Sequence, residues 1–198
     1  MILQKGGLER RRVWHALIRV WHWVFAVLVI VNWGLGEFLA FQTINWHFYL
    51  GYSILGLLMV RLYLGLCGPQ SARFTALPLS PHAIIESLRS FFARSPTGAA
   101  GHTAMGALSI VAMLVAVLLQ ATTGLFVESE EFFETGPLAQ YVSDSLVSWI
   151  TRVHHFNAKV LLVLVGLHVS AIAYYRVWKR EDLLTPMITG WKWVKRID

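Results

Sequence analysis

Four long apolar runs, separated by more polar stretches, organise the 198-residue chain. They cover about residues 21–39, 47–66, 105–127 and 150–176. An α-helix needs about 20 apolar residues to cross the ~30 Å hydrocarbon core of a membrane, and each run has about that length or more. Because lipid offers the backbone no hydrogen-bond partner, such segments are expected to be helical. The pattern predicts an all-α integral membrane protein with a single domain, built as a four-helix transmembrane bundle over residues 1–198.

Charge differs sharply between the segments that join these runs. The N-terminal arm, the linker of residues 67–101 and the C-terminal tail, counting Arg61 and Arg176 at their borders, hold 15 of the 17 Lys and Arg residues. The loop before the fourth run carries five acidic residues: Glu128, Glu130, Glu131, Glu134 and Asp144. The positive-inside rule therefore predicts that both termini are cytoplasmic and that the acidic loop lies outside. Topology and anionic membrane lipids explain the formal charge of +6, so no nucleic-acid partner is expected.

Two shorter segments also have predicted roles. Residues 81–93 of the proline-containing linker are expected to form a short interfacial helix, and the basic tail, which ends in GWKWVKRID, is expected to lie along the membrane surface. The single cysteine, Cys67, excludes an internal disulfide and the two-cysteine motif that attaches haem covalently.

The fourth run carries a histidine near each end, His154 and His168. Fourteen residues of helix place the two side chains about 40° apart around the axis and roughly 21 Å apart along it. His155, by the same arithmetic, points about 140° away from His168. A neutral imidazole is the usual protein ligand for iron in an apolar setting. The helix is therefore predicted to carry two haems, one near each membrane surface.

Two further histidines supply the other ligands of this prediction. His22 begins the first run and His47 begins the second, so the predicted topology pairs His22 with His168 on the cytoplasmic side and His47 with His154 outside. Each pair joins two helices, as ligation of one iron by two imidazoles requires. Polar residues within spanning helices are costly and usually functional. The alternative is a haem-free membrane anchor whose histidines are merely interfacial.

Gly51 and Arg61 complete the predicted cofactor site. Gly51 lies one turn after His47, where a missing side chain lets a flat macrocycle approach the backbone. Arg61 suits the carboxylate of a haem propionate, although topology alone also accounts for it. Lys159 has three open interpretations: snorkelling outward, pairing with a propionate, or contacting the acidic loop. The candidate cofactor-binding residues are His22, His47, His154, His168, Gly51 and Arg61, of which the four histidines are the predicted metal ligands; no catalytic residue is predicted.

Six segments carry a resemblance to a known family: RVWHW (19–23), WHFYLGY (46–52), VRLYLGLCGPQSARF (60–74), TGPLAQYVS (135–143), VHHFNAKVLLVLVGLHVSAI (153–172) and LLTPMITG (183–190). Over nearly the whole chain they resemble the bacterial di-haem cytochrome b561 superfamily, and within it the b-type cytochrome subunits of nickel–iron hydrogenases and their stand-alone relatives. The resemblance implies four spanning helices in the bacterial inner membrane and two b haems, ligated by histidines on helices one, two and four. The matching positions are His22, His47, His154 and His168. One departure is His155, where relatives tend to have another polar residue.

The expected function is transmembrane electron transfer, in an electron-transfer subunit of an oxidoreductase rather than a stand-alone enzyme. Electrons would pass between a periplasmic partner, either a c-type cytochrome or a hydrogenase-like subunit, and the membrane quinone pool, with a quinone as a further ligand. The acidic loop either docks a basic partner or is simply solvated. The alternative is a superoxide:quinone oxidoreductase, for which Arg152 and Lys159 supply positive charge but the acidic loop is unfavourable. Homodimerisation stays open.

Overall fold

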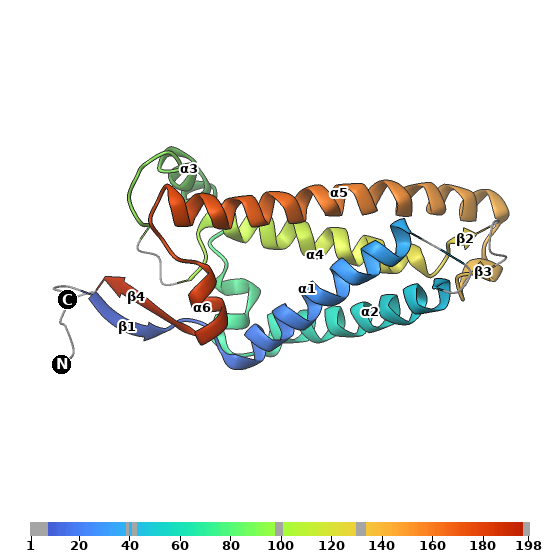
Figure 1. Ribbon diagram of the computed structural model, residues 1–198, viewed down its shortest axis with the longest axis horizontal. Coiled ribbons are helices and arrows are strands. Elements are labelled where there is room, and N and C mark those ends of the chain that lie inside the picture. The colour runs from blue at the N-terminus through green and yellow to red at the C-terminus, as the bar shows by residue number, and fades with distance from the viewer. Residues whose placement is uncertain (1–7, 39, 41–42, 98–100, 130–133, 196–198) are drawn as a thin grey trace. The chain divides into compact units, whose positions relative to one another are not determined.

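Long helices dominate the computed structural model, which describes residues 8–38, 40, 43–97, 101–129 and 134–195 (Figure 1). Four of them are long and apolar enough to cross a membrane. They are α1 (Ala16–Glu37), α2 (Ile44–Cys67), α4 (Ala104–Gly124) and α5 (Asp144–Val177). The predicted helical membrane protein is confirmed.

The helix ends differ from the hydropathy pattern by several residues. Helix α1 begins at Ala16 and α5 at Asp144, five and six residues before the predicted runs. The α5 extension, DSLVSW, is more polar than its run, and a carboxylate such as Asp144 is favourable at a helix N-terminus. The α1 extension, ALIRV, is apolar except for Arg19. Helix α4 ends at Gly124, where Leu125 and Phe126 donate backbone hydrogen bonds to residues three positions earlier. Such tight bonding terminates an α-helix.

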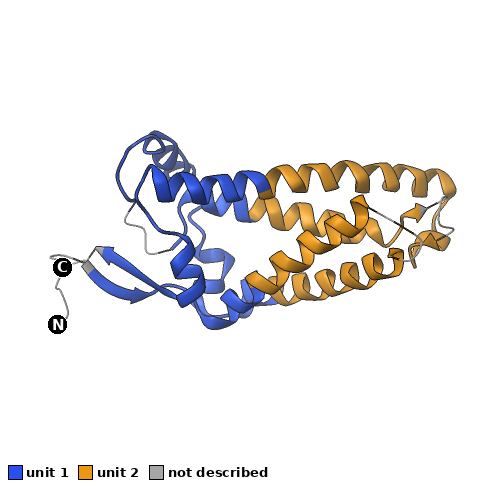
Figure 2. Cartoon of the chain, viewed as in Figure 1, with its two compact units in different colours: residues 1–21, 63–110, 166–198 blue, residues 22–62, 111–165 orange. Residues whose placement is uncertain are grey.

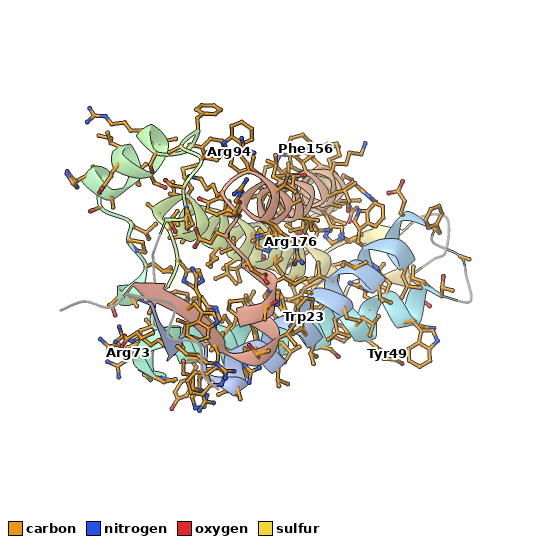
Figure 3. All side chains as sticks on the ribbon, turned by 60° about the vertical axis from the view of Figure 1, so that its left-hand side comes forward. Trp23, Tyr49, Arg73, Arg94, Phe156 and Arg176 are labelled. Atoms are coloured by element: carbon orange, nitrogen blue, oxygen red, sulfur yellow. The ribbon has the colours of Figure 1, made fainter. Side chains whose placement is uncertain are left out.

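The outer surfaces of these helices are strongly apolar. Val27 and Ile30 of α1 are 57% and 58% exposed, and Val163 of α5 is 61% exposed. Figure 3 shows Tyr49 of α2 and Phe156 of α5 pointing away from their helices. A protein surrounded by water rarely exposes so much contiguous apolar surface, whereas lipid accepts it. The exposed side chains therefore agree with membrane insertion.

The chain forms two compact units (Figure 2). The first unit comprises residues 1–21, 63–110 and 166–198, and the second comprises residues 22–62 and 111–165. All four spanning helices run through both units, so neither unit is a continuous segment of the chain. The prediction of a single domain stays a prediction.

The second unit has a core to which all four spanning helices contribute. Its buried residues are Ile54 of α2, Ala116 and Val117 of α4, and Leu161 of α5. Apolar residues of α1, including Phe25, pack against this cluster. Beyond α4 the chain forms a small antiparallel ribbon, β2 (Glu128–Ser129) with β3 (Glu134–Thr135), and a single helical turn, η3 (Ala139–Tyr141).

The first unit contains a second ribbon, which the sequence did not predict. Strand β1 (Leu8–Arg12) pairs antiparallel with β4 (Trp191–Lys195), with Arg12 opposite Trp191. The short helix α6 (Leu184–Thr189) precedes β4 and ends at Gly190, which has a φ of 87°. The carbonyl of Gly190 accepts backbone hydrogen bonds from Val13 and Trp14. The basic arm and the basic tail are thus joined.

The polar linker of the first unit folds as short helices. Two single turns, η1 (Gln70–Ala72) and η2 (Phe74–Ala76), precede α3 (Pro81–Arg89), the helix predicted at residues 81–93. Ser80 caps α3 by accepting a hydrogen bond from the backbone of Ala83. After α3 the chain is fixed to the end of α5, where the buried Lys179 donates to the carbonyls of Ser90 and Ala93.

Candidate functional site

Two of the four candidate histidines, His47 and His154, lie close together in the second unit. His47 is in the first turn of α2, and His154 is about three turns into α5. Their ring centroids are 6.4 Å apart, with the ring planes at 81°. A metal–imidazole bond is about 2 Å long, so two imidazoles on opposite sides of one metal have centroids roughly 6 Å apart. The observed spacing fits such an arrangement.

A cavity of about 450 Å³ surrounds these two rings. This volume falls within the range of about 300–1,000 Å³ that is usual for small-molecule and cofactor sites. Helices α1, α2, α4 and α5 all contribute to its wall, which is mainly apolar. Its polar lining residues are Asn32, Glu37, His47, Tyr52, Gln120, Glu128, Glu134, His154, His155 and Lys159.

Glycines make room for both imidazoles. A Cβ atom on Gly36 of α1 would lie 2.9 Å from Cε1 of His47, and one on Gly124 of α4 would lie 3.2 Å from Cε1 of His154. Sequence reasoning missed both glycines and singled out Gly51 instead. Gly51 lines the cavity, and a Cβ atom there would meet only Nδ2 of Asn32, at 3.8 Å.

Hydrogen bonds orient both rings. Nδ1 of His47 lies 3.0 Å from the backbone carbonyl of Asn32. Nδ1 of His154 lies 3.0 Å from Oγ1 of Thr123, and its Nε2 lies 3.0 Å from Nε2 of Gln120. The side-chain oxygen of Asn32 is buried in the cavity wall with no hydrogen-bond partner among the described residues. Such an atom is normally satisfied by a bound polar group or by water.

His155 is the residue after His154 in α5. Its side chain is exposed, and it borders the cavity. Lys159 is also exposed and borders the cavity. The predicted outer loop has five acidic residues. Glu128 and Glu134 line the cavity, Asp144 begins α5, and Glu130 and Glu131 lie outside the described residues.

The remaining candidate residues, His22, His168 and Arg61, do not line this cavity. His22 is a half-buried residue of α1 in the second unit, and His168 is a half-buried residue of α5 in the first unit. Arg61 is buried within α2 and does not line the cavity described above. The predicted pairing of His22 with His168 and the role of Arg61 are not tested by this arrangement.

The donor set around the cavity fits haem better than a bare metal ion. Across the described ranges, no group of three or more His, Cys, Asp or Glu residues is arranged to hold a metal. Two imidazoles suffice for haem, because the porphyrin supplies the remaining ligands to iron. The apolar wall, the two rings and the glycines that accommodate them together suit a flat, largely apolar cofactor.

Comparisons with known proteins give a consistent picture. The sequence model of a family described as "Prokaryotic cytochrome b561" matches residues 13–190. A "Probable Ni/Fe-hydrogenase B-type cytochrome subunit" from Azotobacter vinelandii is 24% identical over 217 aligned positions, which cover 92% of this chain and 88% of the relative. A protein of the same description from Azotobacter chroococcum mcd 1 matches with the same identity and coverage.

Proposed function

The chain belongs to the prokaryotic cytochrome b561 family, and from this premise we propose that it carries electrons across the bacterial inner membrane through two b haems. Membership and the four apolar helices identify a multi-pass b-type cytochrome of electron transport. The number of haems, their ligands, the partners and the orientation belong to the proposal. When bound, each haem iron supplies reversible one-electron chemistry.

The first proposed haem is held by His47 and His154. The single observation that carries this assignment is the 6.4 Å separation of the two ring centroids inside a cavity of cofactor size. Gly36 and Gly124 leave space beside the rings, and Gly51 lines the cavity. Two imidazoles together with the porphyrin would occupy every ligand position of the iron, which would favour electron transfer over oxygen chemistry.

The second proposed haem is held by His22 and His168. Support comes from the position of each residue along its own helix. His22 lies roughly 9 Å from the start of α1, and His168 lies roughly 14 Å from the end of α5. In the proposed topology both helix ends are cytoplasmic, so both imidazoles lie on that side. Arg61, near the same end of α2, is proposed to neutralise a propionate.

Different partners are proposed for the two sides of the membrane. The rim of the cavity beside His47 and His154 contains Glu37, Glu128 and Glu134, with Lys159 as its one Lys or Arg among the described lining residues. Such a surface suits a basic periplasmic partner, such as a c-type cytochrome or a hydrogenase subunit like that named for the relatives. The same acidic rim disfavours superoxide as a substrate, because superoxide is an anion.

The side of the membrane that carries both termini is proposed to be cytoplasmic and to be the side on which electrons are exchanged with a membrane quinone. The β1–β4 ribbon supports this orientation. Its register places Arg10 opposite Trp193 and Arg12 opposite Trp191 on one face, and both tryptophans are exposed. Arginines beside exposed tryptophans suit anionic lipid headgroups at a membrane surface. A homodimer is compatible with this proposal and is not required by it.

Haem content per chain tests the ligand assignment. We expect two b haems in the purified wild-type protein and one in His154→Ala, measured by haem extraction against protein concentration. The neighbouring variant His155→Ala is the matched control and should keep both haems. Loss of a haem in His155→Ala with two retained in His154→Ala would reverse the assignment, and a haem-free wild type would leave only a membrane anchor.

A further inference from the structure

An unbroken line of hydrogen bonds runs through His154 between two backbone carbonyls of α4. Asn157 Nδ2 donates to the carbonyl of Ala116 at 2.9 Å and to Oε1 of Gln120 at 2.7 Å. Gln120 Nε2 contacts His154 Nε2 at 3.0 Å, and His154 Nδ1 contacts Thr123 Oγ1 at 3.0 Å. Thr123 then donates to the carbonyl of Leu119 at 2.6 Å. All of these residues belong to the second unit.

The two ends of this line impose the same tautomer on His154. A carbonyl oxygen only accepts hydrogen bonds, so the side-chain amide nitrogen of Asn157 must be the group that donates to Ala116. The same nitrogen also contacts Gln120, so Gln120 must present its amide oxygen to Asn157. The amide nitrogen of Gln120 then faces the imidazole of His154. His154 Nε2 accordingly accepts, which puts the proton on Nδ1. At the other end, the carbonyl of Leu119 takes the only proton of Thr123, so the hydroxyl must accept from His154 Nδ1.

Burial keeps the line intact. Thr123 is 8% exposed and Asn157 is 5% exposed, so water has little access to either side chain. His47 has the same tautomer, with its proton on Nδ1, because Nδ1 faces the backbone carbonyl of Asn32, which can only accept. In both histidines the lone pair that can bind a metal is therefore on Nε2. In His154 that lone pair accepts the hydrogen bond from Gln120 in this structure, so ligation of iron requires the Gln120 amide to move away from it.

We propose that Thr123 is a positioning residue for His154, fixing the Nδ1–H tautomer and the ring orientation so that Nε2 is presented to the haem iron. Gln120 competes with iron for that same nitrogen, so the bond to Thr123 is the one that keeps the proton on Nδ1 when haem is bound. This inference rests on the proposed ligation of haem by His154. A hydrogen bond from the distal nitrogen of a ligating imidazole makes the ligand more basic, and loss of such a partner typically costs about 10–100-fold in metal affinity.

Thr123→Val tests this role, because valine keeps the shape of threonine and removes the hydroxyl. We expect haem affinity at one of the two sites to fall about 10-fold or more. The midpoint potential of that haem should rise, since a less basic imidazole stabilises the oxidised iron less, while the other potential stays unchanged. Thr123→Ser restores a hydroxyl and should recover both properties. Potentiometric titration followed by visible absorption, together with haem extraction, measures them.

Thr122→Val is the matched control. Thr122 is the preceding residue of α4, and its hydroxyl also bonds back to helix carbonyls, those of Leu118 and Leu119, at 2.7 and 3.2 Å. This variant should match the wild type, so an equal change in both valine variants would assign the effect to helix structure and overturn the inference. Wild-type potentials and haem content in Thr123→Val, or haem loss in the serine variant as well, would also overturn it. If His154→Ala retains two haems, the ligand assignment itself fails instead.

Discussion

Gly36 of α1 is the glycine at which an added Cβ atom would come nearest to His47. Its missing side chain leaves room for His47, since a Cβ atom would lie 2.9 Å from Cε1 of the imidazole. The imidazole ring cannot easily move away, because its Nδ1 is hydrogen-bonded to the backbone carbonyl of Asn32. We expect Gly36→Ala to displace the ring and to weaken haem binding at this site by roughly 10-fold, the scale of a disturbed ligand orientation. Haem retention during dilution in detergent measures the effect.

Gly34→Ala provides the comparison. This residue is on the same helix, and a Cβ atom there would meet nothing within 4 Å. The variant should hold haem as the wild type does. Equal retention in Gly36→Ala would show that the imidazole does not need the space that the glycine leaves.

Glu181, in the first unit, supports a prediction about the stability of the fold. Its buried carboxylate contacts Lys192 Nζ at 2.7 Å and accepts hydrogen bonds from the backbone and the hydroxyl of Thr97. Burial alone would raise the pKa of Glu181, but the bonds from Lys192 and Thr97 outweigh burial and lower this pKa below its ordinary value. The group therefore stabilises the fold at pH values above its unfolded pKa of about 4.3 and loses that contribution as the pH falls through the folded pKa.

Replacing Glu181 tests this linkage. Glu181→Gln leaves the amine of Lys192 without its carboxylate, and breaking a buried ion pair costs roughly 3 kcal/mol. We expect this loss in the free energy of unfolding at pH 7, and a smaller difference from the wild type at pH values below about 4.3. The exposed Glu86→Gln should match the wild type at both pH values. A deficit that does not change with pH would contradict a role for the ionised carboxylate.

At the scale of single residues, the sequence indicated which helices carry the candidate histidines but not which side chains surround them. The spacing of His154 and His168 follows from helix geometry alone, and His47 lies beside His154 in the structure. Gly36, Thr123 and Gln120 were missed because their roles depend on how neighbouring helices are rotated. The pattern GLG at positions 34–36 was the available signal for the glycine, but it does not show which glycine faces a ring.

At the scale of elements, Gly190 is the junction of the C-terminal segment. It ends α6 with a φ of 87°. Its carbonyl oxygen accepts hydrogen bonds from the backbone N–H groups of Val13 and Trp14. A Cβ atom there would lie 3.0 Å from the carbonyl oxygen of Trp14. We expect Gly190→Ala to destabilise the fold by about 1–3 kcal/mol, because both the left-handed backbone and the contact oppose a side chain. The thermal unfolding midpoint in detergent should fall.

Gly166→Ala is the control for this element. Gly166 lies within α5 with open space around it, and alanine favours a helix over glycine by roughly 0.5–1 kcal/mol. This variant should unfold at the same temperature as the wild type or higher. An unchanged midpoint in Gly190→Ala would mean that the turn tolerates a side chain.

The long helices were predictable and the ribbons were not. Each spanning helix is a long apolar run, so its signal lies within one segment of the sequence. Strand β1 contains three consecutive arginines and shows no alternation of apolar and polar residues. Its partner β4 lies at the other end of the chain, and such a pairing depends on tertiary contacts that a local pattern does not contain. The starts of α1 and α5 were missed by five and six residues because a helix can begin before its longest apolar run.

At the scale of the whole molecule, charge and histidine depth lead to the same proposal. Basic residues gather in the segments predicted to be cytoplasmic, and acidic residues line the cavity beside His47 and His154. Two haems on opposite sides of a membrane would give electrons a route across the lipid, with a different partner at each end. The central claim is that the four histidines act as two pairs.

A redox titration of the wild type and of four single variants tests this claim most directly. The variants His22→Ala, His47→Ala, His154→Ala and His168→Ala are titrated while the absorption of the reduced haems is recorded. We expect two midpoint potentials in the wild type. His22→Ala and His168→Ala should remove or shift one of them, and His47→Ala and His154→Ala the other. A single haem in the wild type, or variants that group in any other way, would contradict the account.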